Sequence, residues 1–245
     1  MTKYSADPFP YWVIDDFLPQ EDAWAASEHF HDAGGPWTRR HHLYSRHKET
    51  RAQGLPETVE RVLQRLEGEG MRHYLAQLSD FPALHADPER FGGGQHVIYR
   101  GGRLGIHADF THHPTTGMRR ALNLLLYLNP NWKAGDGGEL ELWSADMQRC
   151  VKRIEPLMNR AVLFKTSMTS FHGHPEPLKT SERRSLAVYY YTKSGALPMA
   201  SDYAYVKWGY LNTTNYHPRP WEYGLRLRRW VSKLVKGTVK GTKGT

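Results

Sequence analysis

Short runs of β-forming residues, separated by glycine-rich and turn-forming segments, fill the middle of the chain and limit its fold more than any other feature. The runs within residues 95–192 are HVIYR, ALNLLLYLN, ELELW, RAVLFK and SLAVYYYT. Runs of this length and spacing are typical of a β-sandwich or a β-barrel. The sequence therefore predicts a mainly β core over about residues 95–192.

The first third of the chain predicts helices that flank this core. The run YWVI at residues 11–14 predicts a strand, and QEDAWAASEHF at residues 20–30 predicts a helix, because acids open it and apolar residues recur at helical spacing. Residues 55–78 predict one broken helix or two successive helices around Gly68. Residues 35–54 are polar and basic, and we expect a loop there.

Length and composition favour one domain in a reducing compartment. The chain has 245 residues and no apolar run near the roughly 18–20 residues that span a bilayer, so we expect a single domain over residues 1–236. The N-terminus has no apolar run followed by small residues, so no secretory signal is predicted. Cys150 is the single cysteine, which excludes internal disulfides and multi-cysteine zinc sites and fits a cytoplasmic location. Any metal would therefore be held by histidine and carboxylate.

The net charge of +8 is concentrated near the C-terminus. Residues 226–245 contain seven basic residues and no acid, so the rest of the chain is nearly neutral. We expect no nucleic-acid partner, because the body has no basic stripe and no nucleic-acid motif. Residues 225–235 predict a basic amphipathic helix, docked on the core or lying on an anionic membrane, and we favour docking because no second membrane anchor is visible. Residues 237–245 predict a disordered basic tail.

Two histidine clusters, about 65 residues apart, predict a metal site. His107 and Asp109 lie two residues apart, and in an extended segment such residues point to the same face. This pair alone could also be a turn histidine bonded to an aspartate. His172 and His174 follow downstream, shortly before Arg183. Two histidines and one carboxylate leave open positions that suit non-haem Fe(II), and a nearby arginine suits a dicarboxylate cosubstrate.

Further motifs accompany these residues in a fixed order. They are HAD at 107–109, LLYLN at 125–129, GDGGELELW at 135–143, RAVLFK at 160–165, SFHGHPEPL at 170–178 and RRSLAVYYYT at 183–192. Together they resemble the catalytic core of the prolyl-4-hydroxylase-like Fe(II)/2-oxoglutarate-dependent dioxygenases. The resemblance implies a double-stranded β-helix, a jelly-roll or cupin-like fold with N-terminal helices, whose mouth holds the iron.

The resemblance implies that His107 and Asp109 are the first two iron ligands. The third would be His172 or His174, which lie 11 and 9 residues before Arg183. The shorter spacing is similar to several family members, but bacterial relatives keep the first histidine of the HGxP stretch, so we favour His172. The other histidine would then lie near the metal or face the substrate.

The resemblance also implies a cosubstrate site. Arg183 matches the basic residue that pairs with the distal carboxylate of 2-oxoglutarate, and alternation along a strand would turn Arg184 away. Tyr127 matches a tyrosine whose hydroxyl reaches the same carboxylate, and Tyr99 matches a tyrosine that touches the cosubstrate. Asn123 would share the face of Tyr127. Each of these last three residues could also be an ordinary core residue.

The implied reaction uses Fe(II), 2-oxoglutarate and O2 to hydroxylate an unactivated C–H bond, and it releases succinate and CO2. Asp109 stands where related halogenases have Gly or Ala, so hydroxylation is favoured over chlorination. The substrate would be a small molecule or a peptidyl residue, recognised by residues 35–54 and 194–224. The alternatives are a metal-binding jelly-roll protein without turnover and a His/Asp/His zinc hydrolase. Arg183 and Tyr127 argue against the hydrolase, because a hydrolase needs no dicarboxylate clamp.

Overall fold

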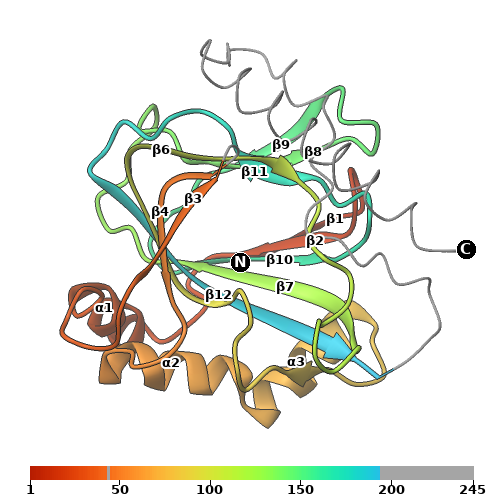
Figure 1. The fold of residues 1–245 in the computed structure, drawn as a ribbon. Helices are drawn as coiled ribbons and strands as arrows, with labels where there is room; N and C mark the ends of the chain where they lie inside the picture. The colour runs from red at the N-terminus through yellow and green to blue at the C-terminus, as the bar shows by residue number, and fades with distance from the viewer. Residues whose placement is uncertain (43–44, 194–245) are drawn as a thin grey trace, which may run out of the picture. The chain divides into compact units, whose positions relative to one another are not determined.

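The computed structural model describes residues 1–42 and 45–193 (Figure 1). The predicted C-terminal helix, the basic tail and the substrate segment 194–224 lie outside these ranges, as does the end of the predicted domain at residue 236. Among the described residues, no helix has both the length and the apolar character that crossing a membrane requires.

The described residues form one curled antiparallel sheet of twelve strands, arranged as two facing layers (Figure 1). The lower layer contains β1 (Thr2–Ser5), β2 (Tyr11–Ile14), β10 (Arg160–Lys165), β7 (Arg119–Tyr127) and β12 (Glu182–Thr192). The upper layer contains β11 (His172–His174), β8 (Leu140–Trp143) and β9 (Cys150–Ile154). The prediction of a mainly β jelly-roll core is therefore confirmed.

One long strand, β6 (Gly94–His107), belongs to both layers. Its first half pairs with β12, and its second half pairs with β11. The other edge of β6 pairs with β4 (Ser45–Arg51), which in turn pairs with β3 (Thr38–His42). A short strand, β5 (His85–Ala86), pairs with the end of β12. Because β6 crosses from one layer to the other, it links the two halves of the barrel.

The hairpin of β3 and β4 is a correction to the sequence prediction. Residues 35–54 were expected to form a loop, because their polar and basic side chains lack the pattern of a typical strand. The backbone of β4 nevertheless pairs with β6 over most of its length. Backbone pairing to an existing strand can override a weak local preference. Most of the segment is therefore part of the sheet.

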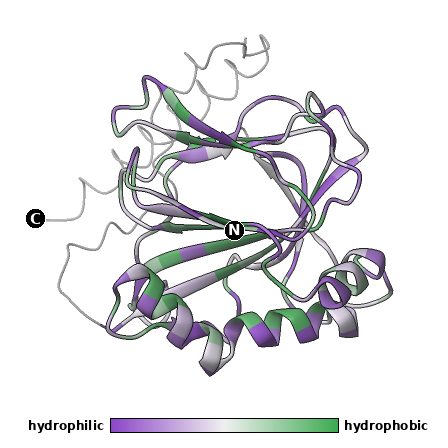
Figure 2. Cartoon of the chain, turned by 180° about the vertical axis from the view of Figure 1, so that it is seen from behind, coloured by the Kyte–Doolittle hydropathy of each residue, from purple (hydrophilic) through white to green (hydrophobic). Residues whose placement is uncertain are grey.

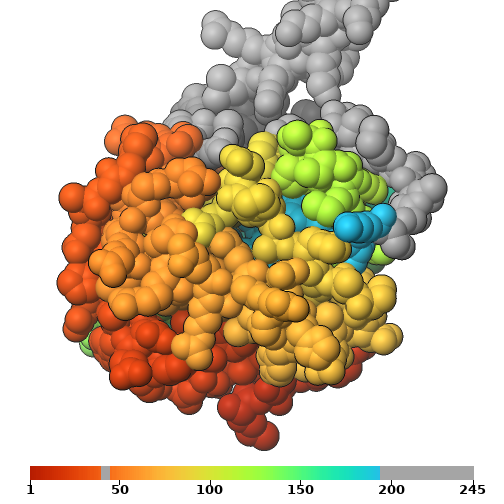
Figure 3. All heavy atoms as spheres, turned by 90° about the horizontal axis from the view of Figure 1, so that it is seen from below, coloured from red at the N-terminus to blue at the C-terminus, as the bar shows by residue number. Residues whose placement is uncertain are grey.

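Three helices cover the outer face of the lower layer (Figures 1 and 3). The predicted first helix is confirmed as α1 (Gln20–Glu28). The prediction for residues 55–78 resolves into two helices, α2 (Glu57–Glu67) and α3 (Glu69–Ser79). Gly68 has an extended backbone between them and so interrupts the helical path.

The helices pack on the sheet through one apolar stripe of α2. Its buried residues are Val59, Val62, Leu63 and Leu66. Figure 2 shows apolar residues gathered in the strands of the lower layer, and polar and apolar residues alternating along the helices. The hydroxyl of Tyr190, on β12, donates a hydrogen bond of 2.7 Å to the carbonyl of Leu66. This hydrogen bond links α2 to β12, the strand that carries one arginine of the site described below.

Replacing Leu63 with alanine should lower the free energy of unfolding by about 2–5 kcal/mol, because a cavity would remain in the core. Leu63 is fully buried in this cluster. The control is Arg61→Ala, an exposed position on the same helix, which should change the free energy by less than about 0.5 kcal/mol. Urea denaturation followed by circular dichroism measures both. Equal effects would contradict the packing described here.

Candidate active site

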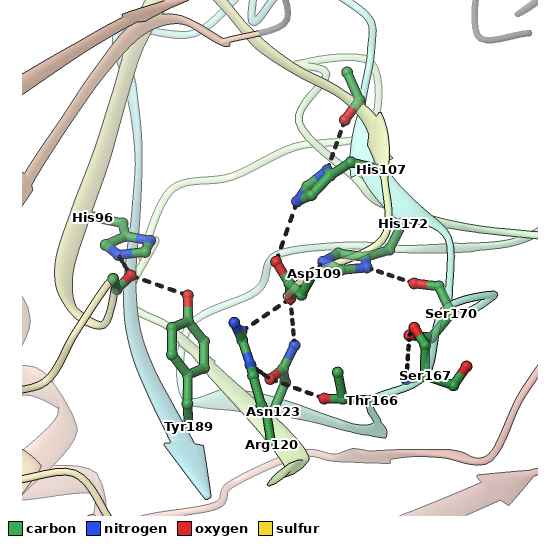
Figure 4. Close-up of polar contacts among 12 residues, drawn as sticks. His96, His107, Asp109, Arg120, Asn123, Thr166, Ser167, Ser170, His172 and Tyr189 are labelled. Atoms are coloured by element: carbon green, nitrogen blue, oxygen red, sulfur yellow. Dashed lines mark hydrogen bonds and ion pairs between the residues drawn. The ribbon is translucent and has the colours of Figure 1, made fainter. Parts of the chain in front are cut away.

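The ends of β6 and β11 bring three metal-binding side chains together. His107, the last residue of β6, lies directly opposite His172, the first residue of β11. Asp109 follows His107 by two residues. The three side chains offer ligand atoms within 4.8 Å of one another. The imidazole ring centres of His107 and His172 are 4.6 Å apart (Figure 4).

Backbone carbonyls hold both imidazoles in one orientation. Nδ1 of His107 donates to the carbonyl of Gly105 at 2.8 Å, and Nδ1 of His172 donates to the carbonyl of Ser170 at 2.9 Å. Because a carbonyl can only accept, each ring carries a proton on Nδ1, and its Nε2 faces Asp109. Metal-binding histidines are usually oriented in this way.

The distances at the centre of the site fit a bound cation. The Nε2 atoms of His107 and His172 lie 3.5 Å from the nearest carboxylate oxygens of Asp109. This distance is longer than an ordinary hydrogen bond. Burial lowers the pKa of the His172 imidazole to about 4, so this ring is neutral at neutral pH and its Nε2 has a free lone pair. Two imidazoles and one carboxylate are the donor set of a non-haem Fe(II) site.

A buried network holds the Asp109 carboxylate in place (Figure 4). Its Oδ2 atom accepts hydrogen bonds from Arg120 Nη2 at 2.9 Å and from Asn123 Nδ2 at 2.7 Å. Asn123 Oδ1 in turn accepts from Arg120 Nε at 2.6 Å and from the hydroxyl of Thr166 at 3.2 Å. Burial alone would raise the pKa of Asp109, but the positive charge of Arg120 outweighs it and holds the pKa well below its ordinary value. The carboxylate is therefore ionised and aimed at the two histidines.

Arg120 is a site residue that the sequence analysis missed. Its guanidinium contacts two aromatic rings that are perpendicular to each other, 4.5 Å from the ring centre of Phe110 and 3.4 Å from that of Tyr189. The register of β7 against β12 shifts between Leu122 and Arg120, which leaves Ala121 as an extra residue in β7. Such a bulge changes the side to which the following side chains point. It therefore lets Arg120 and Asn123, three residues apart, face the same carboxylate.

The metal-binding residues open into a cavity of about 330 Å³ that also contains Arg183. The guanidinium of Arg183 donates from Nε to the carbonyl of Gly138 at 2.7 Å, and from Nη2 to the hydroxyl of Tyr127 at 3.0 Å. A Cβ atom at Gly138 would lie 2.9 Å from Cδ of Arg183, so glycine is needed there. Nη1 of Arg183 makes no hydrogen bond with the described residues. This end of the guanidinium can bind a ligand carboxylate.

Two of the residues singled out in the sequence, Asn123 and Tyr99, lie differently from the expectation. Asn123 reaches Asp109 rather than a cosubstrate position. Tyr99 is not among the residues that line the cavity; it packs against the helical core, and its hydroxyl donates to Glu49 at 3.4 Å. Arg184 lies outside the cavity, as expected, and pairs with Glu182.

His174 lines the cavity but does not join the three metal-binding residues. The structure brings His172, and not His174, together with His107 and Asp109. Burial and the nearby charges of Arg183 and Lys48 hold the pKa of His174 well below its ordinary value. Neither nitrogen of its ring has a hydrogen-bond partner among the described residues.

The fold and the site define a jelly-roll protein with two histidines and one carboxylate converging beside a buried arginine. Residues 94–191 match the 2OG-Fe(II) oxygenase superfamily. The match covers two fifths of the chain, and over these residues the chain is similar to that superfamily, whose name states its cofactors, Fe(II) and 2-oxoglutarate. The matched range includes His107, Asp109, Tyr127, His172 and Arg183.

Individual proteins also resemble the chain. Prolyl 3-hydroxylase OGFOD1 from Mus musculus is 33% identical over 84 residues, which are 32% of this chain and only 15% of that protein. A prolyl-4-hydroxylase from Pseudomonas putida is 20% identical, with a TM-score of 0.55 that covers 75% of this chain and 92% of the other. HygX from Streptomyces hygroscopicus, solved with nickel and 2-oxoglutarate bound, is 10% identical, with a TM-score of 0.53 over 75% of this chain and 83% of the other. The two structures show that the fold is shared.

Replacing Arg120 with methionine should weaken binding of a divalent metal by about 10- to 100-fold, the usual effect of removing a group that orients a metal ligand. The control is Arg119→Met, at the neighbouring and partly exposed position, which should change the affinity by less than twofold. Calorimetric titration with Co(II), with the melting temperature measured in parallel, tests both variants. Unchanged metal affinity in a folded Arg120→Met protein would contradict the role of the network.

Proposed function

We propose that the protein is an Fe(II)- and 2-oxoglutarate-dependent dioxygenase that hydroxylates an unactivated C–H bond and releases succinate and CO2. The observation that carries this proposal is the presence, in one cavity, of three converging metal-binding side chains and a buried arginine with one free end. The similarity to prolyl hydroxylases supports it. The substrate would be a small molecule or a peptidyl residue, and the single cysteine supports a cytoplasmic location.

His107, Asp109 and His172 would hold the metal. When bound, Fe(II) supplies the oxidative decarboxylation of 2-oxoglutarate and the transfer of an oxygen atom to a C–H bond. The protein fixes the ligands beforehand, because each of the three is held by hydrogen bonds to groups outside the centre. Asp109 also fills the position that halogenases leave to chloride, which favours hydroxylation.

Arg183 and Tyr127 would bind the distal carboxylate of 2-oxoglutarate. Nη1 of Arg183 would donate to this carboxylate. Nε and Nη2 already donate to the carbonyl of Gly138 and to the hydroxyl of Tyr127. Burial raises the pKa of Tyr127, so its hydroxyl stays protonated at neutral pH. Since this hydroxyl accepts from Arg183, its own proton is left to donate to the carboxylate. A zinc hydrolase would have no use for this pair.

The direct test is an anaerobic titration of the protein with Fe(II) and then with 2-oxoglutarate. A weak visible charge-transfer band should form in the wild-type protein and should be absent in His107→Ala and His172→Ala, because two ligands are too few to hold the metal. His174→Ala should still form the band. A succinate assay with candidate substrates then tests turnover. A wild-type protein that binds both additions without forming the band would contradict the proposal.

Arg183→Ala should weaken binding of 2-oxoglutarate by roughly 30-fold to several-thousand-fold, because a desolvated arginine–carboxylate pair typically contributes about 2–5 kcal/mol. Arg184→Ala is the matched control. It removes a contact to Glu182 and a hydrogen bond to the carbonyl of Ser27, so it should lower stability and leave the affinity within about twofold. Titration of the band with 2-oxoglutarate measures both. Equal losses of affinity would show that the clamp is assigned to the wrong arginine.

A further inference from the structure

The cavity contains a buried histidine, His96, that neither the metal centre nor the clamp uses. His96 lies on β6, is 7% exposed and lines the cavity. It does not belong to the group of described residues whose ligand atoms converge on the metal position. Its ring is therefore available to a different partner.

The carbonyl of Gly92 fixes the tautomer of this ring. Nε2 of His96 lies 3.0 Å from the carbonyl oxygen, and a carbonyl only accepts, so Nε2 carries the proton. Burial holds the pKa of His96 well below its ordinary value, so the ring is neutral at neutral pH. In a neutral imidazole the second nitrogen is an acceptor. Nδ1 of His96 therefore has a lone pair, and it makes no hydrogen bond with the described residues.

A series of direct contacts links His96 to the metal centre. The carbonyl of Gly92 also accepts a hydrogen bond of 3.1 Å from the hydroxyl of Tyr189 (Figure 4). The ring of Tyr189 lies against the guanidinium of Arg120, which in turn binds Asp109. These contacts fix the position of His96 relative to the metal-binding residues.

Strand pairing places two hydroxyl groups beside His96. It pairs with Thr50 of β4 on one side and with Ser185 of β12 on the other. Residues paired across neighbouring strands turn their side chains to the same face, and all three of these residues line the cavity. This part of the cavity wall therefore suits a ligand that forms hydrogen bonds.

The cosubstrate cannot be the partner of Nδ1. When both of its carboxylates are ionised, 2-oxoglutarate has acceptor oxygens and no N–H or O–H group, and the same is true of succinate. An acceptor nitrogen gains no hydrogen bond from either molecule. A substrate that has a hydroxyl or an amide N–H group can donate one. The chemistry of the ring therefore points to the substrate and not to the cosubstrate.

We propose that Nδ1 of His96 accepts a hydrogen bond from the substrate, and that the substrate has a hydroxyl or an amide N–H group for this contact. The inference rests on the proposed dioxygenase function and names the group by which that site selects its substrate. The aromatic rings of Phe91, Phe110 and Tyr189 also line the cavity, so an apolar part of the same molecule has a surface to pack on. A cavity of about 330 Å³ lies at the small end of ligand sites, which fits a compact molecule or a single residue.

The test uses the full-length protein loaded anaerobically with Fe(II) and 2-oxoglutarate. The probes are methyl hexosides, which donate from hydroxyl groups, and N-acetyl-L-amino acid methylamides, which donate from amide N–H groups. Each probe is paired with a counterpart in which methyl groups replace the donor hydrogens, and binding is followed as a change in the charge-transfer band. At least one probe should bind about 5- to 150-fold more tightly than its counterpart, because a buried acceptor would otherwise lose its partner. If no probe binds better than its counterpart, the proposal is wrong.

Variants assign the preference to His96. His96→Phe keeps a flat ring but removes the acceptor, so the preference for the donor probe should fall below about twofold. His96→Gln keeps an acceptor oxygen and should retain part of the preference. Both variants should leave the affinity for 2-oxoglutarate within about twofold, because the cosubstrate has no donor for Nδ1. The control is His73→Phe, at an exposed position of α3, which should change neither affinity.

Two results with these variants would overturn the proposal. One is an unchanged preference in His96→Phe, and the other is a loss of 2-oxoglutarate affinity as large as that in Arg183→Ala. Nitrogen NMR of the isotope-labelled wild-type protein, loaded with Zn(II), is an independent measurement if a variant fails to fold. It should find Nδ1 of His96 without a proton, and a protonated Nδ1 would also overturn the proposal. Absence of the charge-transfer band in the wild-type protein would instead refute the proposed function itself.

Discussion

The register between β6 and β11 is the constraint on which the whole site depends. His107 and His172 face each other because they are a directly paired couple at the ends of these two strands. A slip of one residue would turn the β11 histidines to the outer face. Gly173 helps to fix the register, since a Cβ atom there would lie 2.7 Å from the carbonyl oxygen of Gly105. The carbonyl of Gly105 also accepts the hydrogen bond from Nδ1 of His107. The close approach of Gly173 to this carbonyl therefore fixes both the strand register and the orientation of the His107 ring.

The second requirement is a charged carboxylate inside a buried cavity. Burial disfavours ionisation of Asp109, and the positive charge of Arg120 beside it favours the ionised form. Arg120 and Asn123 both donate a hydrogen bond to Oδ2 of Asp109, and Arg120 also donates to the side-chain oxygen of Asn123. Each of the three side chains is therefore bonded to the other two. The aromatic rings of Phe110 and Tyr189 pack against the guanidinium of Arg120. The carboxylate of Asp109 is thus held in position by protein groups alone.

Much of this architecture could be predicted from the sequence, because the β runs, the glycine turns and the two histidine clusters are local patterns. Other parts depend on long-range pairing. The strand β4 has a polar sequence and is held by its neighbour β6, so no local pattern identifies it. The role of Arg120 depends on the extra residue at Ala121, which becomes visible only when β7 is aligned with β12. The resemblance assigned Tyr99 to the cosubstrate, but Ile98 is the residue that lines the cavity, and Tyr99, next to it in β6, packs against the helical core.

The three cationic side chains of the cavity are held by different means. Arg120 is bound to Asp109, and Arg183 is fixed by the carbonyl of Gly138 and the buried hydroxyl of Tyr127. Lys48 lies on β4, whose link to the rest of the sheet is formed by its backbone. Backbone pairing does not depend on the identity of the side chains at positions 45, 48 and 50. Substitutions at these three positions, which line the cavity, can therefore change its wall without breaking the pairing of β4 with β6.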